Sequence, residues 1–347
     1  MPDLSDRGND PDLRSARSHP DHWYPLAKSR DLKPGGMRAV SFAGDPIVLV
    51  RPEKGALYAL EDRCAHRQVP LHEGTVCGEQ LKCGYHGWTY DRAGKCVEVP
   101  YLGKAHPNGV RAYPCREEYG LIFVFPGDPA KAVPESFPQI PTWANPRYKT
   151  RYLDRRVRCH YSFMHENLMD MNHQFLHRSL MGGIQATLLG HTRGEDFVEA
   201  RYTFTRVKGR QSLGERFMLS GSSGTDVRSE HDVMTIRTQY PYQTLAFRRS
   251  HTDEPMLDLW LCYVPTDAAQ GSNHSYGLMM IRKPAIPGLI ELFWPFIVWF
   301  TEGIFAQDRR VVELEQRAHD AQHGDWNQEI FPVIRSLREL LLRKAAK

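Results

Sequence analysis

Cys64-Ala65-His66 and Cys83-Gly84-Tyr85-His86 are the two short stretches around which the rest of the chain is organised. As a pattern they read C-x-H and C-x-x-H, separated by residues 67–82. Two thiolates and two imidazoles in this order suit a [2Fe–2S] cluster in which one iron keeps two Cys ligands and the other takes two His ligands. We therefore predict a cluster of intermediate reduction potential bound by Cys64, His66, Cys83 and His86.

A structural zinc site is the alternative, because two Cys and two His are also a common zinc set. Zinc sites more often pair Cys with Cys and His with His at short spacing, whereas each loop here mixes the two residue types. His72 and Cys77 lie between the loops but break the spacing, so we interpret them as ordinary loop residues. The mixed loops favour the iron–sulfur cluster.

The composition indicates a soluble globular protein with room for two domains. The chain has 347 residues, of which 41% are hydrophobic and 25% are charged. Its net charge of +4 is spread without a long basic block, so a nucleic-acid-binding function has little support. The seven Cys show no disulfide-scaffold spacing, which fits a reducing compartment and predicts a cytoplasmic protein.

The domain organisation follows from changes in pattern along the chain. Residues 1–20 are polar, so we expect a disordered tail rather than a signal peptide or anchor. Short β-type runs separated by turn residues then predict an all-β domain over residues 21–135, which contains the cluster loops. A Pro-rich linker, residues 126–141, marks the boundary with a second domain over residues 136–347.

The second domain alternates between helical and strand-like sequence. Helix-forming segments cover residues 161–180, 289–322 and 330–344, and strand-like runs fill most of residues 197–282. We therefore predict an α+β domain of the helix-grip type, with a large antiparallel sheet and helices at both ends. Residues 289–300 are very apolar but too few to span a bilayer, so we expect a buried helix, with a membrane-surface contact as the alternative.

The first of these helical segments contains a second group of metal-binding side chains. His173 and His177 stand four residues apart, so on a helix both would project from one face and hold one ion. Asp170 is three residues before His173 and is expected on the same face, where its carboxylate would accept the other ring N–H of a ligand His. A pair of His at this spacing is by itself more often structural or exposed. We interpret this pair as a metal site because the predicted [2Fe–2S] cluster lies upstream in the same chain and needs an acceptor for its electrons.

Together, the two groups resemble the oxygenase component of the Rieske non-haem iron oxygenases, and the resemblance covers nearly everything after residue 20. The loop flanks Cys-Ala-His-Arg and Cys-Gly-Tyr-His-Gly-Trp resemble the family on both sides. Arg67 and Trp88 match family positions that surround the cluster, and Gln68 stands where the family often has Gly.

The family pattern N-x-x-D-x-x-H, followed by a second His, is matched by Asn167, Asp170, His173 and His177. Three residues separate the two His here, whereas four are commoner in the family, and His165 is the alternative ligand. The resemblance implies a mononuclear Fe(II) held by two His and one carboxylate, with Asp308 in the ligand position of a C-terminal helix. The competing carboxylates are Glu302, Glu313 and Glu315.

The resemblance also implies an activity and its partners. A chain of this length resembles the monooxygenase branch, which includes vanillate-demethylase-like and pheophorbide-oxygenase-like enzymes. Family members use O2 and electrons from a ferredoxin or flavin reductase, and a homotrimer passes electrons from the cluster of one subunit to the iron of its neighbour. In that arrangement Asp170 takes the role of an electron bridge toward His86 of the neighbour.

The substrate is expected to be a hydrophobic, aromatic or polycyclic small molecule. The residues flanking the proposed iron helix are aromatic or Met-rich: Phe163, Met164, Met169, Phe175, Leu180 and Met181. Fold and metals do not fix the reaction, so hydroxylation and oxidative demethylation stay open. The alternative function is a Rieske-type electron carrier fused to a hydrophobic-ligand-binding domain without a second functional iron.

Overall fold

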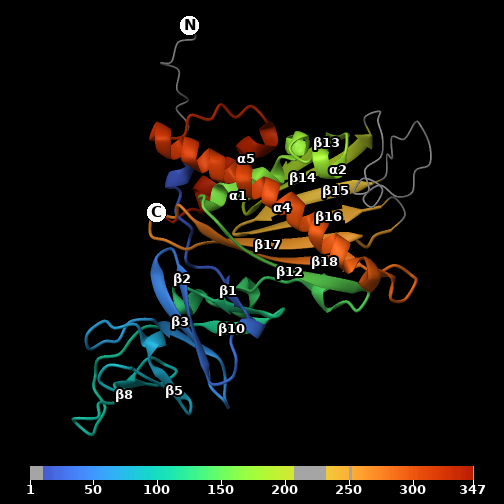
Figure 1. Ribbon diagram of the computed structural model, residues 1–347. Helices are drawn as coiled ribbons and strands as arrows, with labels where there is room; N and C mark the ends of the chain where they lie inside the picture. Colours follow the sequence, from blue (N-terminus) through green and yellow to red (C-terminus); the bar gives the residue numbers. More distant parts are fainter. Residues whose placement is uncertain (1–10, 207–231, 250–251, 347) are drawn as a thin grey trace. The chain divides into compact units, whose positions relative to one another are not determined.

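Antiparallel sheets form the framework of both parts of the computed structural model, which describes residues 11–206, 232–249 and 252–346 (Figure 1). The described chain divides into two units. One contains residues 18–140 with 264–270, and the other contains residues 11–17, 141–263 and 271–346. The part of the second unit between residues 206 and 232 lies outside the described residues.

The first unit contains three small antiparallel sheets. One sheet has the order β2 (Gly36–Phe42), β3 (Asp45–Arg51), β4 (Tyr58–Glu61) and β9 (Ala112–Tyr113). The next has the order β5 (Thr75–Cys77), β6 (Gln80–Lys82), β7 (Thr89–Tyr90) and β8 (Cys96–Glu98). The last has β1 (Tyr24–Lys28), β11 (Leu121–Val124) and β10 (Cys115–Glu118). Short 3-10 helices connect them: η2 (Ser29–Asp31), η3 (Leu71–Glu73), η4 (Pro129–Lys131) and η5 (Pro134–Ser136).

The second unit is built on a seven-stranded sheet of order β12-β18-β17-β16-β15-β14-β13. The strands are β12 (Tyr148–Val157), β13 (Ile184–Arg193), β14 (Phe197–Arg206), β15 (Val233–Gln239), β16 (Tyr242–Arg248), β17 (Leu257–Pro265) and β18 (Asn273–Arg282). Burial alternates along β15 and β16, so one face of this part of the sheet carries the core. The helices are η1 (Leu13–Ser15), η6 (Pro141–Ala144), α1 (Tyr161–Met169), η7 (Met171–Phe175), α2 (Arg178–Met181), α4 (Leu289–Gln322) and α5 (Pro332–Lys344). This architecture confirms the predicted fold class.

The helical segment predicted over residues 161–180 is interrupted. It breaks at Asp170, whose backbone is extended and whose side chain accepts a hydrogen bond from the N–H of Asn172. Asp at the N-cap satisfies a free backbone donor of the next turn, so α1 ends there and the 3-10 helix η7 begins. The prediction that His173, His177 and Asp170 share one α-helical face is therefore wrong.

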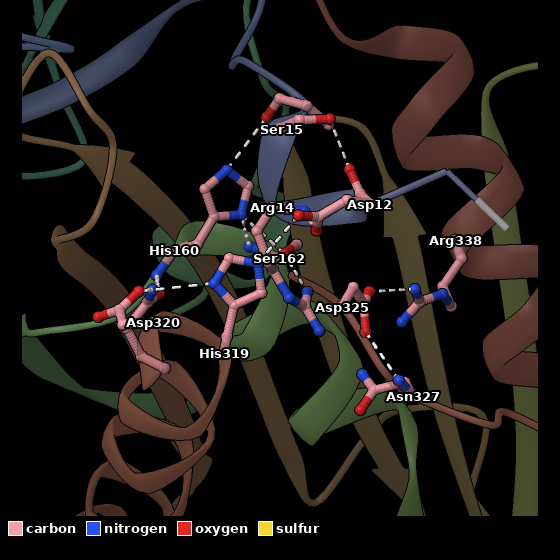
Figure 2. A network of polar contacts seen from close by, with 12 residues as sticks. Asp12, Arg14, Ser15, His160, Ser162, His319, Asp320, Asp325, Asn327 and Arg338 are labelled. Atoms are coloured by element: carbon pink, nitrogen blue, oxygen red, sulfur yellow. Dashed lines mark hydrogen bonds and ion pairs between the residues drawn. The ribbon is translucent and has the colours of Figure 1, made fainter. Parts of the chain in front are cut away.

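Residues 11–20 also differ from the prediction of a disordered tail. Leu13 is fully buried, and Arg14 bonds Ser162 (Figure 2) and Glu166, both of α1. Asp12 pairs with His319 of α4 at 3.0 Å (Figure 2). The segment is ordered because Leu13 and Ala16 pack in the core of the second unit and its ionic side chains have partners there. Residues 1–10 lie outside the described part of the chain.

The prediction of a buried helix over residues 289–300 is correct on one face only. Ile290, Ile297 and Phe300 are buried, and the first two belong to the main core of the unit. Leu292 and Trp299, in contrast, are 73% and 61% exposed. The segment forms the first turns of α4, which continues to Gln322 and confirms the helix predicted over residues 289–322 (Figure 1).

Candidate metal centres

The first unit brings together the four predicted cluster ligands on two loops. Cys64 and His66 lie between β4 and β5, and Cys83 and His86 lie between β6 and β7. Both Cys are buried, and the rings of His66 and His86 are 4.6 Å apart between centroids. Burial raises the pKa of the Cys83 thiol, whose hydrogen-bond contacts include the backbone of Tyr85 and the Cys64 side chain. The four side chains thus form a Cys pair and a His pair.

The two loops have the same backbone hydrogen bonds. The N–H of each Cys donates to the carbonyl five residues later, Cys64 to Val69 and Cys83 to Trp88. The carbonyl of each Cys accepts from the residue four positions on, which has a positive φ: Gln68 at 61° and Gly87 at 73°. Gly adopts this conformation without strain, which explains why the family often has Gly at the position that Gln68 occupies in this chain.

The surroundings of this site fit a [2Fe–2S] group. Nδ1 of His66 is buried and has no hydrogen-bond partner among the described residues, as a nitrogen that serves as a metal ligand would be. The indole of Trp88 stacks on the His66 ring, 5.0 Å between centroids and 5° from parallel. The hydroxyl of Tyr90 accepts from the N–H of Ala65 at 3.0 Å and lies 3.1 Å from Sγ of Cys64, so its proton is available to a thiolate at Cys64.

His72 and Cys77 lie apart from this group, as predicted. The backbone N–H of His72 donates to Asp62 at 2.8 Å, and its ring bonds the other carboxylate oxygen of the same Asp. Cys77 lies on β5 and is exposed.

The second unit brings His173, His177 and Asp308 together from three elements. His173 lies in η7, His177 precedes the first turn of α2, and Asp308 lies in the middle of α4. Oδ1 of Asp308 is 3.2 Å from Nε2 of His177 and 3.8 Å from Nε2 of His173. One ligand atom from each residue lies within 4.8 Å of the other two, which is the arrangement that one metal ion requires.

The electrostatics of this site also fit a cation. Oδ1 of Asp308 and Nδ1 of His173 are buried without hydrogen-bond partners among the described residues. Burial lowers the pKa of His173, although Asp308 opposes this shift. Burial would also lower the pKa of His177, but the adjacent carboxylate of Asp308 and the contact with Gln307 raise it overall. Two imidazoles and a carboxylate on one side of an ion leave its other side open, as in the 2-His-1-carboxylate triad.

Gln307 supports this site, and the sequence interpretation missed it. Nδ1 of His177 donates to Oε1 of Gln307 at 2.8 Å, which leaves Nε2 of the ring facing Asp308. Nε2 of Gln307 donates in turn to Oγ of Ser179 at 3.0 Å. Partners of this kind fix the tautomer and orientation of a ligand His. The sequence contains one indication of this role, because Gln307 directly precedes the predicted ligand Asp308.

The alternative ligands lie elsewhere in the fold. His165 is 1% exposed on α1, with its ring edge-on to Tyr263 at 4.8 Å. Glu302 forms ion pairs with Arg151 and Arg155, and Glu313 accepts from the backbone N–H of Arg158 at 3.2 Å. Glu315 does not belong to the group around Asp308. The carboxylate of Asp170 accepts two hydrogen bonds from Asn172 rather than one from a ligand His, which corrects the expected contact.

The flanking apolar residues separate into two sets. Phe163, Met164 and Met169 belong to the core of the unit, whereas Phe175 is 63% exposed. Leu180 and Met181 are partly exposed.

Two metal-ligand sets, one on a β-rich unit and one on a helix-flanked seven-stranded sheet, define an oxygen-activating iron enzyme with its own electron-transfer cluster. Residues 22–114 match the family model of the Rieske [2Fe–2S] domain, and residues 157–332 match that of the vanillate O-demethylase oxygenase C-terminal domain. The chain therefore belongs to the Rieske non-haem iron oxygenases and is an oxygenase component. Its cofactors are a Rieske [2Fe–2S] cluster and a mononuclear iron.

Individual relatives agree with this classification. The 4β-methylsterol monooxygenase of Methylococcus capsulatus is 32% identical, over 96% of this chain and 90% of the relative. The oxygenase component of dicamba O-demethylase from Stenotrophomonas maltophilia is 37% identical, over 45% of this chain and 47% of the relative. The crystal structure of dicamba monooxygenase bound to dicamba shares the fold, with a TM-score of 0.73 and 23% identity over 93% of this chain and 97% of that chain.

Proposed function

We propose that this chain is a monooxygenase that inserts one atom of O2 into a hydrophobic, polycyclic or aromatic small molecule, by hydroxylation or oxidative demethylation. The observation that carries the proposal is the convergence of His173, His177 and Asp308 on one point. A chain that only carried electrons would have no need of this second site. Relatives named for a methylsterol and for dicamba suggest a lipophilic ring system as the substrate class.

We assign the two cofactors to specific side chains. Cys64, Cys83, His66 and His86 would hold the [2Fe–2S] cluster, and His173, His177 and Asp308 would hold the iron. When bound, the iron supplies O2 activation beside the substrate and the cluster supplies electrons. The side chains of the protein would favour the neutral form of the buried His173, fix the ring orientation of His177 through Gln307, and keep one side of the site free of ligands from the three residues.

The overall reaction needs an external electron donor. One substrate C–H bond, O2, two electrons and two protons give a C–OH bond and water, so each turnover consumes two electrons. A ferredoxin or a flavin reductase would supply them in a reducing, cytoplasmic compartment. All seven cysteines are free, which fits that location.

Asp170 is proposed as the bridge for electrons that arrive from the cluster of a neighbouring subunit in a homotrimer. Its carboxylate lies at the turn between α1 and η7, is partly exposed, and acts on His173 electrostatically. Asp170→Asn keeps an oxygen that can accept from the N–H of Asn172, so the turn is preserved while the charge is lost. We expect normal iron and sulfide content and turnover reduced about tenfold or more. Normal turnover in this variant would refute the bridging role.

The function is tested with the reduced enzyme, a flavin reductase, and 18O-labelled O2. A 4-methylsterol and an aromatic methyl ether are the first two substrates to compare. Appearance of a single 18O atom in the product, lost in His173→Ala, would support the monooxygenase assignment. Reduction of the cluster without any O2-dependent product from either class would instead favour the electron-carrier alternative. Sedimentation velocity of the same sample tests the trimer.

A further inference from the structure

The first turns of α4 expose large apolar side chains that the fold does not cover. Ile286, in the preceding loop, is 64% exposed, Leu292 is 73% exposed and Trp299 is 61% exposed. Phe293 adds to the same surface at 49%. We call these four residues the α4 apolar surface. An exposed group of this size marks a place where something else binds.

The helix is apolar on two opposite sides at this end. An eighteen-residue stretch within α4 is long and apolar enough in composition to span a membrane, and only 17% of that stretch is buried. It cannot cross a bilayer in this fold, because Ile290, Ile297 and Val312 on its other side belong to the core of the unit. A helix with one face in a core and an apolar opposite face lies along a surface rather than through it.

The charges around this end of α4 are mostly positive. Arg147, Lys149, Arg282 and Lys283 stand here against two carboxylates, Glu254 and Glu291. Four cations against two anions leave a net charge of +2. Lys149 lies 3.3 Å from Glu291 and 4.5 Å from the centroid of the Trp294 ring. Long cationic side chains beside Trp and Phe are typical of helices that lie in a lipid headgroup region.

We propose that the α4 apolar surface docks on an anionic phospholipid bilayer, with its apolar side chains at the boundary between headgroups and acyl chains. The excess of cations selects a bilayer, whose anionic headgroups they complement, over a second copy of this chain, which carries the same positive excess. The docking follows from the surface alone and goes beyond the proposed function.

Docking on a membrane would also help the enzyme to obtain a lipophilic substrate, an argument that rests on the proposed function. Trp299 and Asp308 are nine residues apart on the same helix, which corresponds to about 14 Å along the axis. A lipophilic ring compound dissolved in the bilayer would therefore be released close to the proposed iron site. The docking experiment needs no substrate turnover, so its failure and a failure of the proposed function can be told apart.

Flotation of the purified holoenzyme with vesicles tests the docking. We compare vesicles of phosphatidylcholine alone with vesicles that contain equimolar phosphatidylglycerol. The proposal predicts binding to the anionic vesicles, weaker binding to the neutral ones, and a decrease with added salt because the cationic contribution is screened. The double variant Leu292→Ser, Trp299→Ser should reduce partitioning about tenfold or more.

The matched control is Leu314→Ser, Ile330→Ser, which removes two apolar side chains exposed at 44% and 86% outside this surface. It should bind vesicles like the wild type. Unchanged circular dichroism and an unchanged midpoint of chemical denaturation show that both variants are folded in the second unit, which carries the substitutions. Equal vesicle binding by the wild type and the Leu292→Ser, Trp299→Ser variant would overturn the proposal. So would a change of oligomeric state in that variant without vesicle binding by the wild type, because the surface would then be a subunit interface.

Fluorescence quenching of the wild type tests the docking without the Ser variants. Vesicles with brominated acyl chains should quench part of the tryptophan fluorescence, and Trp299→Phe should lose that part. Quenching that is the same in both proteins would contradict the docking of this surface.

Discussion

Tyr90 is the side chain that we expect to adjust the reduction potential of the [2Fe–2S] cluster. Its hydroxyl accepts from the N–H of Ala65, which leaves its proton for Sγ of Cys64 at 3.1 Å. A hydrogen bond to a cluster sulfur stabilises the reduced, more negative state, so its loss lowers the reduction potential.

We therefore predict that Tyr90→Phe lowers the potential of the cluster. A net hydrogen bond of about 0.5–1.5 kcal/mol corresponds to roughly 20–60 mV for one electron. Redox titration followed by EPR measures the shift at unchanged iron and sulfide content. Tyr58→Phe is the control, because the Tyr58 hydroxyl has no hydrogen-bond partner among the described residues. An unchanged potential in Tyr90→Phe would mean that the hydroxyl does not act on the cluster.

Gln307 is the corresponding residue at the iron site. Gln307→Leu removes the acceptor for Nδ1 of His177 while keeping a similar volume, so the ring is free to change tautomer and orientation. Loss of such a partner typically costs about 10–100-fold in metal affinity. We predict that amount in a competition assay with a chelator. Gln307→Glu, which keeps an acceptor oxygen, should bind iron close to the wild-type level, and equal losses in both variants would contradict this role.

At the scale of elements, the segment around η1 holds the start of α1 in place. Arg14 bonds Ser162 (Figure 2) and Glu166, and its guanidinium lies 3.4 Å from the centroid of the Phe163 ring. Arg338 of α5 bonds Glu166 at 2.9 Å. Glu166 therefore joins η1, α1 and α5. Because α1 leads directly into η7, this network supports the segment that carries His173.

We predict that Arg14→Ala destabilises the catalytic unit by about 1.5–3 kcal/mol, because Glu166 loses one of its two cationic partners. Chemical denaturation monitored by circular dichroism measures the change. Arg193→Ala, which removes an exposed ion pair with Glu339, should cost about 1 kcal/mol or less. Similar effects of the two substitutions would show that η1 is a peripheral attachment.

The elements also show how far the sequence can be interpreted. The strand-like runs predicted within residues 197–282 are confirmed by β15 and β16, each of which buries one face. Strand β13 was missed, since it lies at the edge of the sheet and most of its residues are exposed. The break at Asp170 was missed because His spacing was interpreted as helical, whereas the Asp170-Met171-Asn172 turn chemistry decides the local structure.

The metal sites were more predictable than the packing around them. The eight residues to which we assigned metal or electron-transfer roles follow from short motifs and family resemblance, and the structure brings the two Cys, the two His pairs and Asp308 into the expected groups. The role of Gln307 and the attachment of residues 11–17 depend on contacts between distant segments, which no local pattern records.

At the scale of the whole molecule, buried neutral His residues set the response to acid. Burial lowers the pKa of both His160 and His165 to about 3. Their pKa in the unfolded chain is near 6.5. The unfolded state therefore binds more protons below that pH, and stability present above pH 6.5 is lost as the pH falls toward 3.

Each of these His contributes a slope of about 1.4 kcal/mol per pH unit in that window. We predict that His165→Leu, which removes a fully buried ring with an unbonded Nδ1, unfolds with a shallower pH dependence than the wild type between pH 6 and about 4. Urea unfolding at a series of pH values measures the difference. Parallel curves for the two proteins would show that His165 does not stay neutral in the folded state.

The most direct measurement is iron and acid-labile sulfide per chain in anaerobically purified wild type and Asp308→Ala, with EPR after mild reduction. We predict about three iron atoms and two sulfides in the wild type, and about two of each in the variant with its Rieske signal unchanged. Two iron atoms in both proteins would contradict the second iron site, and with it the oxygenase chemistry assigned to His173, His177 and Asp308.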